Sequence, residues 1–321
     1  MRHTAWRRLA RRCAEALITL FTLVTLTFIL AHTVPGGPAY AILGLKAHPV
    51  SVTAVDMQLG TNIPAWRQYA IWWAHLAHGD FGTSYRLNKD VASVIAEYTG
   101  NTLALDVAGL TLAALCGFAT GLLHGAMPDR WPGRAVNTLE LAFYAMPGFF
   151  IGTVLLMVFA TGLHWLPAGG VVDLRLEHSG PADRVRHMVL PALSLALVGF
   201  PAFSRVLAQS VQTERARDYV RTARAHGLDE ATILWRHVVP NAVRPFVTML
   251  GMTLPALFAG SVVVESVFAY PGIGWLLWRS AVSHDYPVLV AIVLLVGVVT
   301  ILGNLLADLV NTWLDPAARY V

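Results

Sequence analysis

The residues of this chain that could carry out chemistry are concentrated in one polar stretch, residues 221–237, which reads "RTARAHGLDEATILWRH". Its arginine, aspartate and glutamate side chains can form charge-assisted hydrogen bonds with another molecule. Gly227 can adopt the left-handed conformation that ends a helix, and Asp229 can cap a following helix through its carboxylate. The stretch therefore predicts two short helices joined at a glycine, with a basic surface that faces water.

A second group of polar residues could in principle hold a metal ion. His75, His78 and Asp80 lie close together beside a glycine turn. Two histidines three residues apart are weak evidence for a zinc site, which usually takes four well-spaced ligands, and we predict no metal site. The two cysteines, Cys13 and Cys116, are expected to be unpaired thiols, since they form neither a zinc motif nor a disulfide framework.

The chain lacks the phosphate-binding loop that many ATPases use. The pattern G-x-x-x-x-G-K-[ST] does not occur, and neither of the two lysines, Lys46 and Lys89, follows a glycine-rich turn. No serine–histidine–aspartate arrangement stands out either. We therefore expect no catalytic residue, no enzyme activity and no cofactor bound by this chain itself.

Around the polar stretch the chain is strongly apolar, with 56% hydrophobic and 13% charged residues among its 321. Soluble domains carry about 25% charged residues, and an apolar run of about 20 residues is long enough to cross a bilayer as a helix. Six segments meet that requirement: 14–34, 102–127, 138–162, 189–210, 247–269 and 288–313. The sequence therefore predicts an all-α membrane protein with six transmembrane helices. Pro147 and Pro255 interrupt the third and fifth of these spans, where we expect a tolerated kink in each helix.

The distribution of basic residues gives the orientation of these spans. Arginines and lysines number 15 in the segments on one side of the predicted membrane and 8 on the other, and the richer side is expected to be cytoplasmic. Both termini and the polar stretch then face the cytoplasm. The expected organisation is a basic tail (1–13), a first span (14–34), an extracytoplasmic region (35–101), a five-helix core (102–313) containing a cytoplasmic loop (211–246), and a tail (314–321).

Within the extracytoplasmic region, the segment "PAWRQYAIWWAHLAHG" predicts a helix. Trp66, Tyr69 and Trp73 recur at helical spacing, and Gly79 fits a helix C-cap. Aromatic rings along one helix face are typical of the membrane interface. We expect a helix on the outer membrane surface, with a docking surface for a partner as the alternative.

The last span carries small and polar residues on one face. From Gly297 onwards they follow at steps of three or four residues: Thr300, Asn304, Asp308 and Asn311. Such residues avoid lipid and face either other helices or a water-filled route. Helix–helix hydrogen bonding is the preferred interpretation, and a translocation pathway is the alternative. Asp106 and Glu265, near the outer ends of their spans, are interpreted in the same way.

The polar stretch resembles the cytoplasmic coupling loop of ABC-importer permeases, whose consensus is written EAA, three residues, then Gly. Ala223 and Gly227 match it, whereas Arg221 and Thr222 replace Glu and Ala. More narrowly, "YVRTARAHGL" with a later "RH" resembles the oligopeptide/dipeptide/nickel permease family. Ordered blocks elsewhere in the chain agree with that family: "HGDFGTSYR", "MPGFF", "WLPAGG", "VVVESVFAYPGIGWLL", "DYPV", "GNLLADLV" and "LDPAARY".

The resemblance implies a transport subunit of a bacterial inner membrane that forms one half of a heterodimeric pore. The implied partners are a second homologous permease, two cytoplasmic ATPases that bind ATP and Mg²⁺, and an extracytoplasmic binding protein. No nucleic acid is expected. The residues that would contact an ATPase are Arg221, Thr222, Ala223, Gly227, Leu228, Asp229, Ile233, Leu234, Arg236 and His237.

The substrate class follows less directly, because the resemblance covers permeases for peptides, nickel and nickel chelates. We expect a dipeptide or oligopeptide, with nickel or a metal chelate as the alternative. Two other classes stay open at this point. A secondary transporter would need inverted repeats and ionisable groups at the bilayer midplane, and a membrane-anchored scaffold would use the polar stretch only for docking. The presence of an ATPase partner distinguishes all three.

Overall fold

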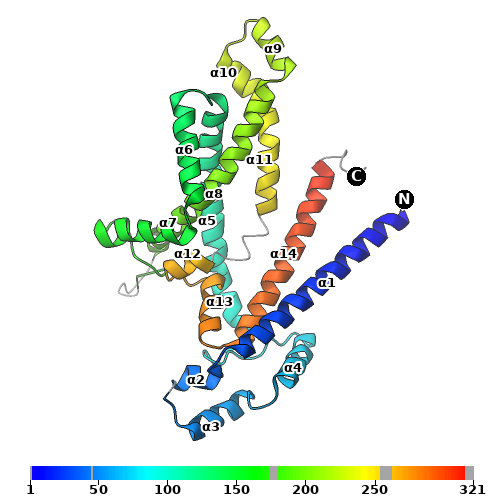
Figure 1. Ribbon diagram of the computed structural model, residues 1–321, viewed down its shortest axis with the longest axis vertical. Coiled ribbons are helices and arrows are strands. Elements are labelled where there is room, and N and C mark those ends of the chain that lie inside the picture. The colour runs from blue at the N-terminus through cyan, green and yellow to red at the C-terminus, as the bar shows by residue number, and fades with distance from the viewer. Residues whose placement is uncertain (1, 45, 174–179, 254–261, 315–321) are drawn as a thin grey trace. The chain divides into compact units, whose positions relative to one another are not determined.

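A computed structural model describes residues 2–44, 46–173, 180–253 and 262–314 (Figure 1); of residues 2–10, 12, 13, 304 and 306–314 it describes only the backbone. Apart from one isolated bridge between Thr83 and Asp90, the regular structure of these residues is entirely helical. Four helices are long and apolar enough to cross a membrane, and a fifth span is possible if one bent helix pair is counted. The all-α membrane fold is thus confirmed, and the number of six spans stays a prediction.

The chain divides into two compact units. Unit 1 comprises Met1–Gly100 and Gly272–Gly303, and unit 2 comprises Asn101–Pro271 and Asn304–Val321. Two long helices, α5 (Val91–Ala126) and α14 (Tyr286–Leu314), begin in unit 1 and continue into unit 2.

Unit 1 contains five further helices: α1 (Arg2–Thr33), α2 (Gly37–Leu43), α3 (Pro49–Leu59), α4 (Ala65–Ala77) and α13 (Ile273–Val282). The aromatic segment predicted as a helix is α4, and Gly79 behind it has the expected positive φ of 78°. Tyr69 packs on Phe28 of α1, with ring centroids 4.9 Å apart, whereas Trp66 is exposed. Part of the aromatic face is therefore used inside the unit, and contact of the rest with the bilayer stays a prediction.

Asp285 ties together two parts of unit 1 that are 200 residues apart in the sequence. Its buried carboxylate accepts a hydrogen bond from the Ser84 hydroxyl (2.5 Å) and another from the Tyr85 backbone N–H (3.0 Å). A buried carboxylate is costly unless its oxygens are hydrogen-bonded, and these donors meet that need. The blocks "HGDFGTSYR" and "DYPV" thus form one structural unit.

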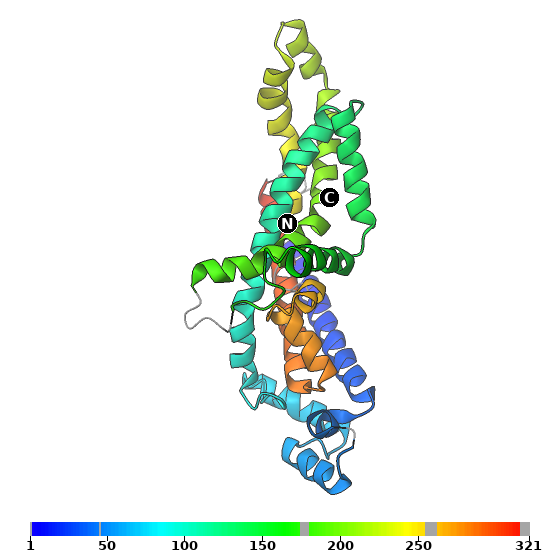
Figure 2. The ribbon, with the colours of Figure 1, turned by 90° about the vertical axis from the view of Figure 1, so that its left-hand side faces the viewer.

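Unit 2 is built around α8 (Pro181–Arg215), which packs against α6 (Trp131–Ala145), α7 (Gly148–Leu155) and α11 (Val239–Thr253). A short helix, α12 (Val262–Val267), packs on α7 and α8. Figures 1 and 2 show α8 and α11 side by side in this unit.

Helix α5 approaches α8 closely because one of its faces is almost free of side chains. A methyl group added at Gly117 would lie 2.5 Å from Phe203 Cβ, and one at Gly121 would lie 2.5 Å from the Ser204 carbonyl oxygen. Gly125 is equally close to Val211. Small residues at every fourth position allow two membrane helices to pack with their backbones in near contact, so no larger residue fits on this face.

The third predicted span, 138–162, is not one straight helix. Helix α6 ends at Ala145, and α7 begins at Gly148 and continues as a π-helix, η1 (Leu156–Gly162). The two parts meet at 103°. Pro147 has an extended φ/ψ of −61°/139° and no backbone N–H to donate, so it breaks the helix where a tolerated kink was expected. Pro255, the other predicted interruption, lies outside the described residues.

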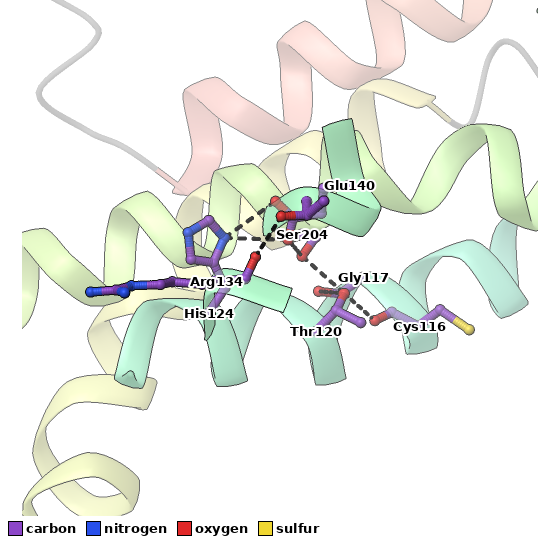
Figure 3. A network of polar contacts seen from close by, with 8 residues as sticks. Cys116, Gly117, Thr120, His124, Arg134, Glu140 and Ser204 are labelled. Atoms are coloured by element: carbon purple, nitrogen blue, oxygen red, sulfur yellow. Dashed lines mark hydrogen bonds and ion pairs between the residues drawn. The ribbon is translucent and has the colours of Figure 1, made fainter. Parts of the chain in front are cut away.

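A polar network joins three helices of unit 2 (Figure 3). Glu140 of α6 is fully buried and accepts a hydrogen bond from the Ser204 hydroxyl of α8. His124 Nδ1 of α5 lies 3.2 Å from Glu140 Oε2, and the Thr120 hydroxyl donates to Ser204 Oγ at 2.9 Å. A buried carboxylate is held only by such partners, so the network fixes α6 against the α5–α8 pair.

Replacement of Glu140 by alanine is expected to destabilise unit 2. Ser204 and His124 would lose their shared acceptor, and a buried polar group left without a partner costs about 1–3 kcal/mol. The measurement is thermal unfolding of the detergent-purified protein, with Glu97→Ala as the control, since Glu97 forms only an exposed ion pair with Lys89. Equal melting temperatures for the two variants would contradict the structural role of the network.

Candidate functional site

The polar stretch forms a compact helical module at the end of α8 and α11. Helix α9 (Asp218–Ala225) follows α8 after a two-residue turn, and α10 (Glu230–Ile233) continues through a π-helix, η2 (Leu234–Val238), directly into α11. Figures 1 and 2 show α9 and α10 beyond the ends of α8 and α11. Helix α8 itself extends to Arg215, so the first short helix of the module begins only at Asp218.

The turn between α9 and α10 has the predicted chemistry. Gly227 has φ +82°, in the left-handed region that disfavours residues with a Cβ atom. The Asp229 side chain accepts a hydrogen bond from the Thr232 backbone N–H at 3.1 Å and so caps α10. Hydrogen bonding to Thr232, by its side chain first and then by this backbone N–H, lowers the pKa of Asp229, so the cap is ionised at neutral pH.

The inner face of the module belongs to the same hydrophobic core as the long helices. Val220 and Ala223 of α9, Ile233 of α10 and Val238 of η2 are buried there. They share this cluster with residues of α8 and α11: Phe203, Leu207, Val211, Ala242 and Phe246. Because interiors are close-packed and resist deformation, a displacement of the module is transmitted to α8 and α11.

Glu230 connects the module with the end of α8. Its carboxylate accepts hydrogen bonds from Arg224 Nε of α9 at 2.5 Å and from Arg215 Nη2 of α8 at 3.0 Å. These bonds, that of Arg224 above all, lower the pKa of Glu230 below its ordinary value. Arg215 also donates to the carbonyl of Ala126, the last residue of α5, at 2.5 Å. One carboxylate and two guanidinium groups thus bridge α8, α9 and α10, and Arg215 extends the bridge to α5.

The outer face of the module has a shallow hollow of about 400 Å³. Its lining residues are Tyr219, Thr222, Ala223, His226, Leu228 and His237. Leu228 is 41% exposed, and Trp235 of η2, which does not line the hollow, is 55% exposed. Large apolar side chains exposed on a polar module are typical of a surface that binds another protein.

The predicted contact residues fall into three groups by their burial. Ile233 points into the core and cannot reach a partner directly, and Ala223 is 8% exposed at the floor of the hollow. Leu234 and His237 are half-buried. The exposed members of the predicted set are Arg221, Thr222, Gly227, Leu228, Asp229 and Arg236. Tyr219, His226 and Trp235 also lie on the outer face, although their sequence positions alone gave no signal.

The predicted pathway residues are only partly described. Glu265 is fully buried, and the Thr102 hydroxyl donates to its Oε1 at 2.9 Å, which is consistent with helix packing. Thr300 on α14 is half-buried. The side chains of Asn304, Asp308 and Asn311 lie outside the described residues. A role of these residues in the pathway stays a prediction.

The histidines at the C-terminal end of α4 make separate local contacts within the chain. His75 Nδ1 lies 2.7 Å from Asp80 Oδ2, and His78 Nδ1 lies 2.8 Å from the Ala74 carbonyl. In the part of the chain that the structure describes, no group of three metal-ligating side chains comes together.

Two family models match the chain over almost its whole length. Residues 113–320 match the binding-protein-dependent transport system inner membrane component. Residues 5–106 match the N-terminal part of binding-protein-dependent transport system membrane components.

Curated relatives match along the entire chain. The glutathione transport system permease protein GsiC of Escherichia coli K12 is 35% identical over 310 residues, which cover 97% of this chain and 98% of the relative. The protein of the same name from Salmonella typhi is 36% identical over the same length.

Solved ABC transporters share the fold. An amino acid ABC transporter crystallised with histidines gives a TM-score of 0.50 at 16% identity, covering 68% of this chain and 92% of the other. The MetNI methionine ABC transporter in an inward-facing conformation gives 0.50 at 17% identity, covering 68% and 96%. The chain belongs to the family of inner membrane components of binding-protein-dependent transport systems and is a multi-pass permease subunit of an ABC importer.

Proposed function

We propose that this permease imports short peptides with energy from ATP hydrolysed by partner subunits. The proposed assembly contains this chain, a second homologous permease, two cytoplasmic ATPases with ATP and Mg²⁺, and an extracytoplasmic binding protein. Both termini and the loop 211–246 would face the cytoplasm, as the distribution of arginines favours. This chain would contribute the transport route and no ATPase site.

The observation that carries the coupling role is the shared hydrophobic core of the module and the long helices. Ile233 and Val238 are buried together with Phe203 of α8 and Phe246 of α11. An ATPase that bound the outer face at Leu228 and Trp235 would therefore move α8 and α11 as it closed. A rigid-body movement of this kind is a known way to switch a protein between two states.

The peptide assignment rests on the relatives, several of which are named as glutathione transport permeases. Glutathione is a tripeptide, so we propose short peptides as the substrate class of this chain as well. Nickel or a metal chelate is the alternative that the family resemblance allows.

Purification of the tagged complex with its ATPases, followed by reconstitution with the binding protein, tests this function. We expect ATP-dependent uptake of labelled glutathione or another tripeptide into proteoliposomes. Uptake of nickel or a nickel chelate in place of peptide would agree with the permease assignment but contradict the proposed peptide substrate. A complex that remained intact but contained no ATPase would contradict the coupling role of residues 221–237.

Replacement of Gly227 by valine should strongly reduce transport without removing the protein from the membrane. Nothing lies within 4 Å of the position of an added Cβ, so the cost arises only from the positive φ, about 1–2 kcal/mol for a residue with a Cβ. Relief of that strain would reorient α9 against α10. The measurement is uptake relative to membrane content, and about a tenfold loss or more is expected, since 1.4 kcal/mol corresponds to tenfold.

Gly251→Val is the matched control, because Gly251 lies in α11 with an ordinary φ and open space around it. Normal uptake by the Gly227 variant, or an equal loss in the control, would refute the role of the turn.

Replacement of Glu230 by glutamine should uncouple transport with little loss of stability. Arg215 and Arg224 would lose their charged partner, but exposed ion pairs contribute only about 0.2–1 kcal/mol. Since the folded-state pKa of Glu230 is lowered, its contribution is present at neutral pH and is lost as the pH falls through that lowered pKa. We expect reduced stimulation of ATPase activity by the loaded binding protein.

Asp218→Asn serves as the control for Glu230→Gln, since it breaks only the exposed pair with Arg221. Unchanged stimulation in the Glu230 variant, measured at neutral pH, would show that the bridge between α8, α9 and α10 is dispensable for coupling.

A further inference from the structure

Unit 1 contains a cavity of about 500 Å³ that the coupling role does not use. It lies between the C-terminal end of α3, one face of α4 and the loop 81–88, with Pro287 completing the wall. Sites for small organic ligands typically measure about 300–1,000 Å³. The cavity is thus large enough for a di- or tripeptide.

Hydrogen bonds within the protein hold the walls of the cavity in place. The Gln68 side-chain amide donates to the Thr61 carbonyl at 3.2 Å and to the Ile63 carbonyl at 2.9 Å. Across the cavity, the loop that contains Ser84 and Tyr85 is held by Asp285 as described above. Such preorganisation reduces the entropy that binding a ligand would cost.

Two carboxamide groups at the cavity remain available for a ligand. Gln58 lines the cavity from α3 and Asn88 lines it from the loop, and both residues are solvent-exposed, so their carboxamides are accessible. Asn88 is held at φ +50°, a conformation that asparagine tolerates better than most residues. A carboxamide offers both a donor and an acceptor, which is the pairing that a peptide group requires.

The remaining lining is largely apolar and carries no acidic or strongly basic side chain. Trp72, Phe81 and Tyr85 provide apolar surface, and burial raises the pKa of Tyr85 to about 12, so its hydroxyl stays neutral. His75 also lines the cavity, where it is paired with Asp80. No Asp, Glu, Lys or Arg occurs among the described lining residues. This chemistry fits an uncharged, amide-rich segment better than a phosphate or a metal ion.

We propose that this cavity is a binding site for the backbone of a short peptide, which it receives before the peptide enters the transport route. The Gln58 and Asn88 carboxamides would pair with a peptide group, and the aromatic rings would contact the peptide's side chains. The proposal rests on the proposed import of peptides and on an extracytoplasmic location of residues 35–101. It adds to that function a substrate site on the permease itself.

Equilibrium binding of a radiolabelled tripeptide to the intact permease–ATPase complex in nanodiscs, without binding protein, tests the site. Wild-type complex should bind the peptide, and the double variant Gln58→Ala/Asn88→Gly should bind it about tenfold more weakly, as expected for the loss of two hydrogen bonds. Glycine preserves the positive φ at position 88. Gln209→Ala, which removes an exposed carboxamide outside the cavity, is the matched control and should bind normally.

A second probe tests the site in the wild-type complex, so its result does not depend on the folding of the double variant. The same tripeptide with N-methylated amides should bind the wild-type complex as weakly as the unmodified peptide binds the double variant, because its backbone donors are removed. Equal affinity of wild type and double variant, or of both peptides for the wild type, would overturn the site. The peptide site would also be overturned if the wild-type complex bound no peptide and the double variant bound the extracytoplasmic binding protein more weakly. That result would assign the cavity to a loop of the binding protein.

Failure of this site is distinguishable from failure of the proposed function. A complete system that imports tripeptides while its cavity binds none would refute only the cavity site. A complete system that imports no peptide at all would refute the substrate class itself.

Discussion

The close approach of α5 to α8 is the packing constraint on which the rest of unit 2 depends. Gly117, Gly121 and Gly125 leave no room for a side chain where α8 crosses. This approach brings Thr120 and His124 of α5 within reach of the polar network around buried Glu140 (Figure 3). Without hydrophobic driving force between helices in a bilayer, close packing and such hydrogen bonds are the main sources of association. The α5–α8 pair therefore provides the rigid body to which α6, α11 and the helical module are attached.

The module is attached to that rigid body in two different ways. Its apolar face is part of the core of α8 and α11, so the attachment resists deformation. Its charged attachment, Glu230 with Arg215 and Arg224, is exposed and contributes mainly to orientation. A partner that binds the outer face thus acts on a stiff element. This arrangement explains why a largely apolar chain contains a folded, basic, water-facing insertion.

Local features were predictable from the sequence, and contacts between distant segments were not. The left-handed Gly227 and the Asp229 cap follow from residue type and short spacing, so both were predicted correctly. The break at Pro147 was underestimated, since proline in a membrane helix is compatible with either a kink or a break. The burial of Glu140, its pairing with Ser204 and the link between Asp285 and Ser84 depend on packing that hydrophobic periodicity does not encode. For the same reason the inward position of Ile233 could not be separated from the exposed positions around it.

Contact between the module and an ATPase is tested most sharply by site-specific photo-crosslinking in native membranes. A photoreactive amino acid would replace Leu228 or Trp235 on the outer face of the module, and Leu87, which is 40% exposed in unit 1, would serve as the control position. If the module couples transport to ATP hydrolysis, positions 228 and 235 form an adduct with an ATPase subunit and position 87 does not. An active complex in which neither position 228 nor position 235 formed an adduct with an ATPase would contradict the coupling role of the module.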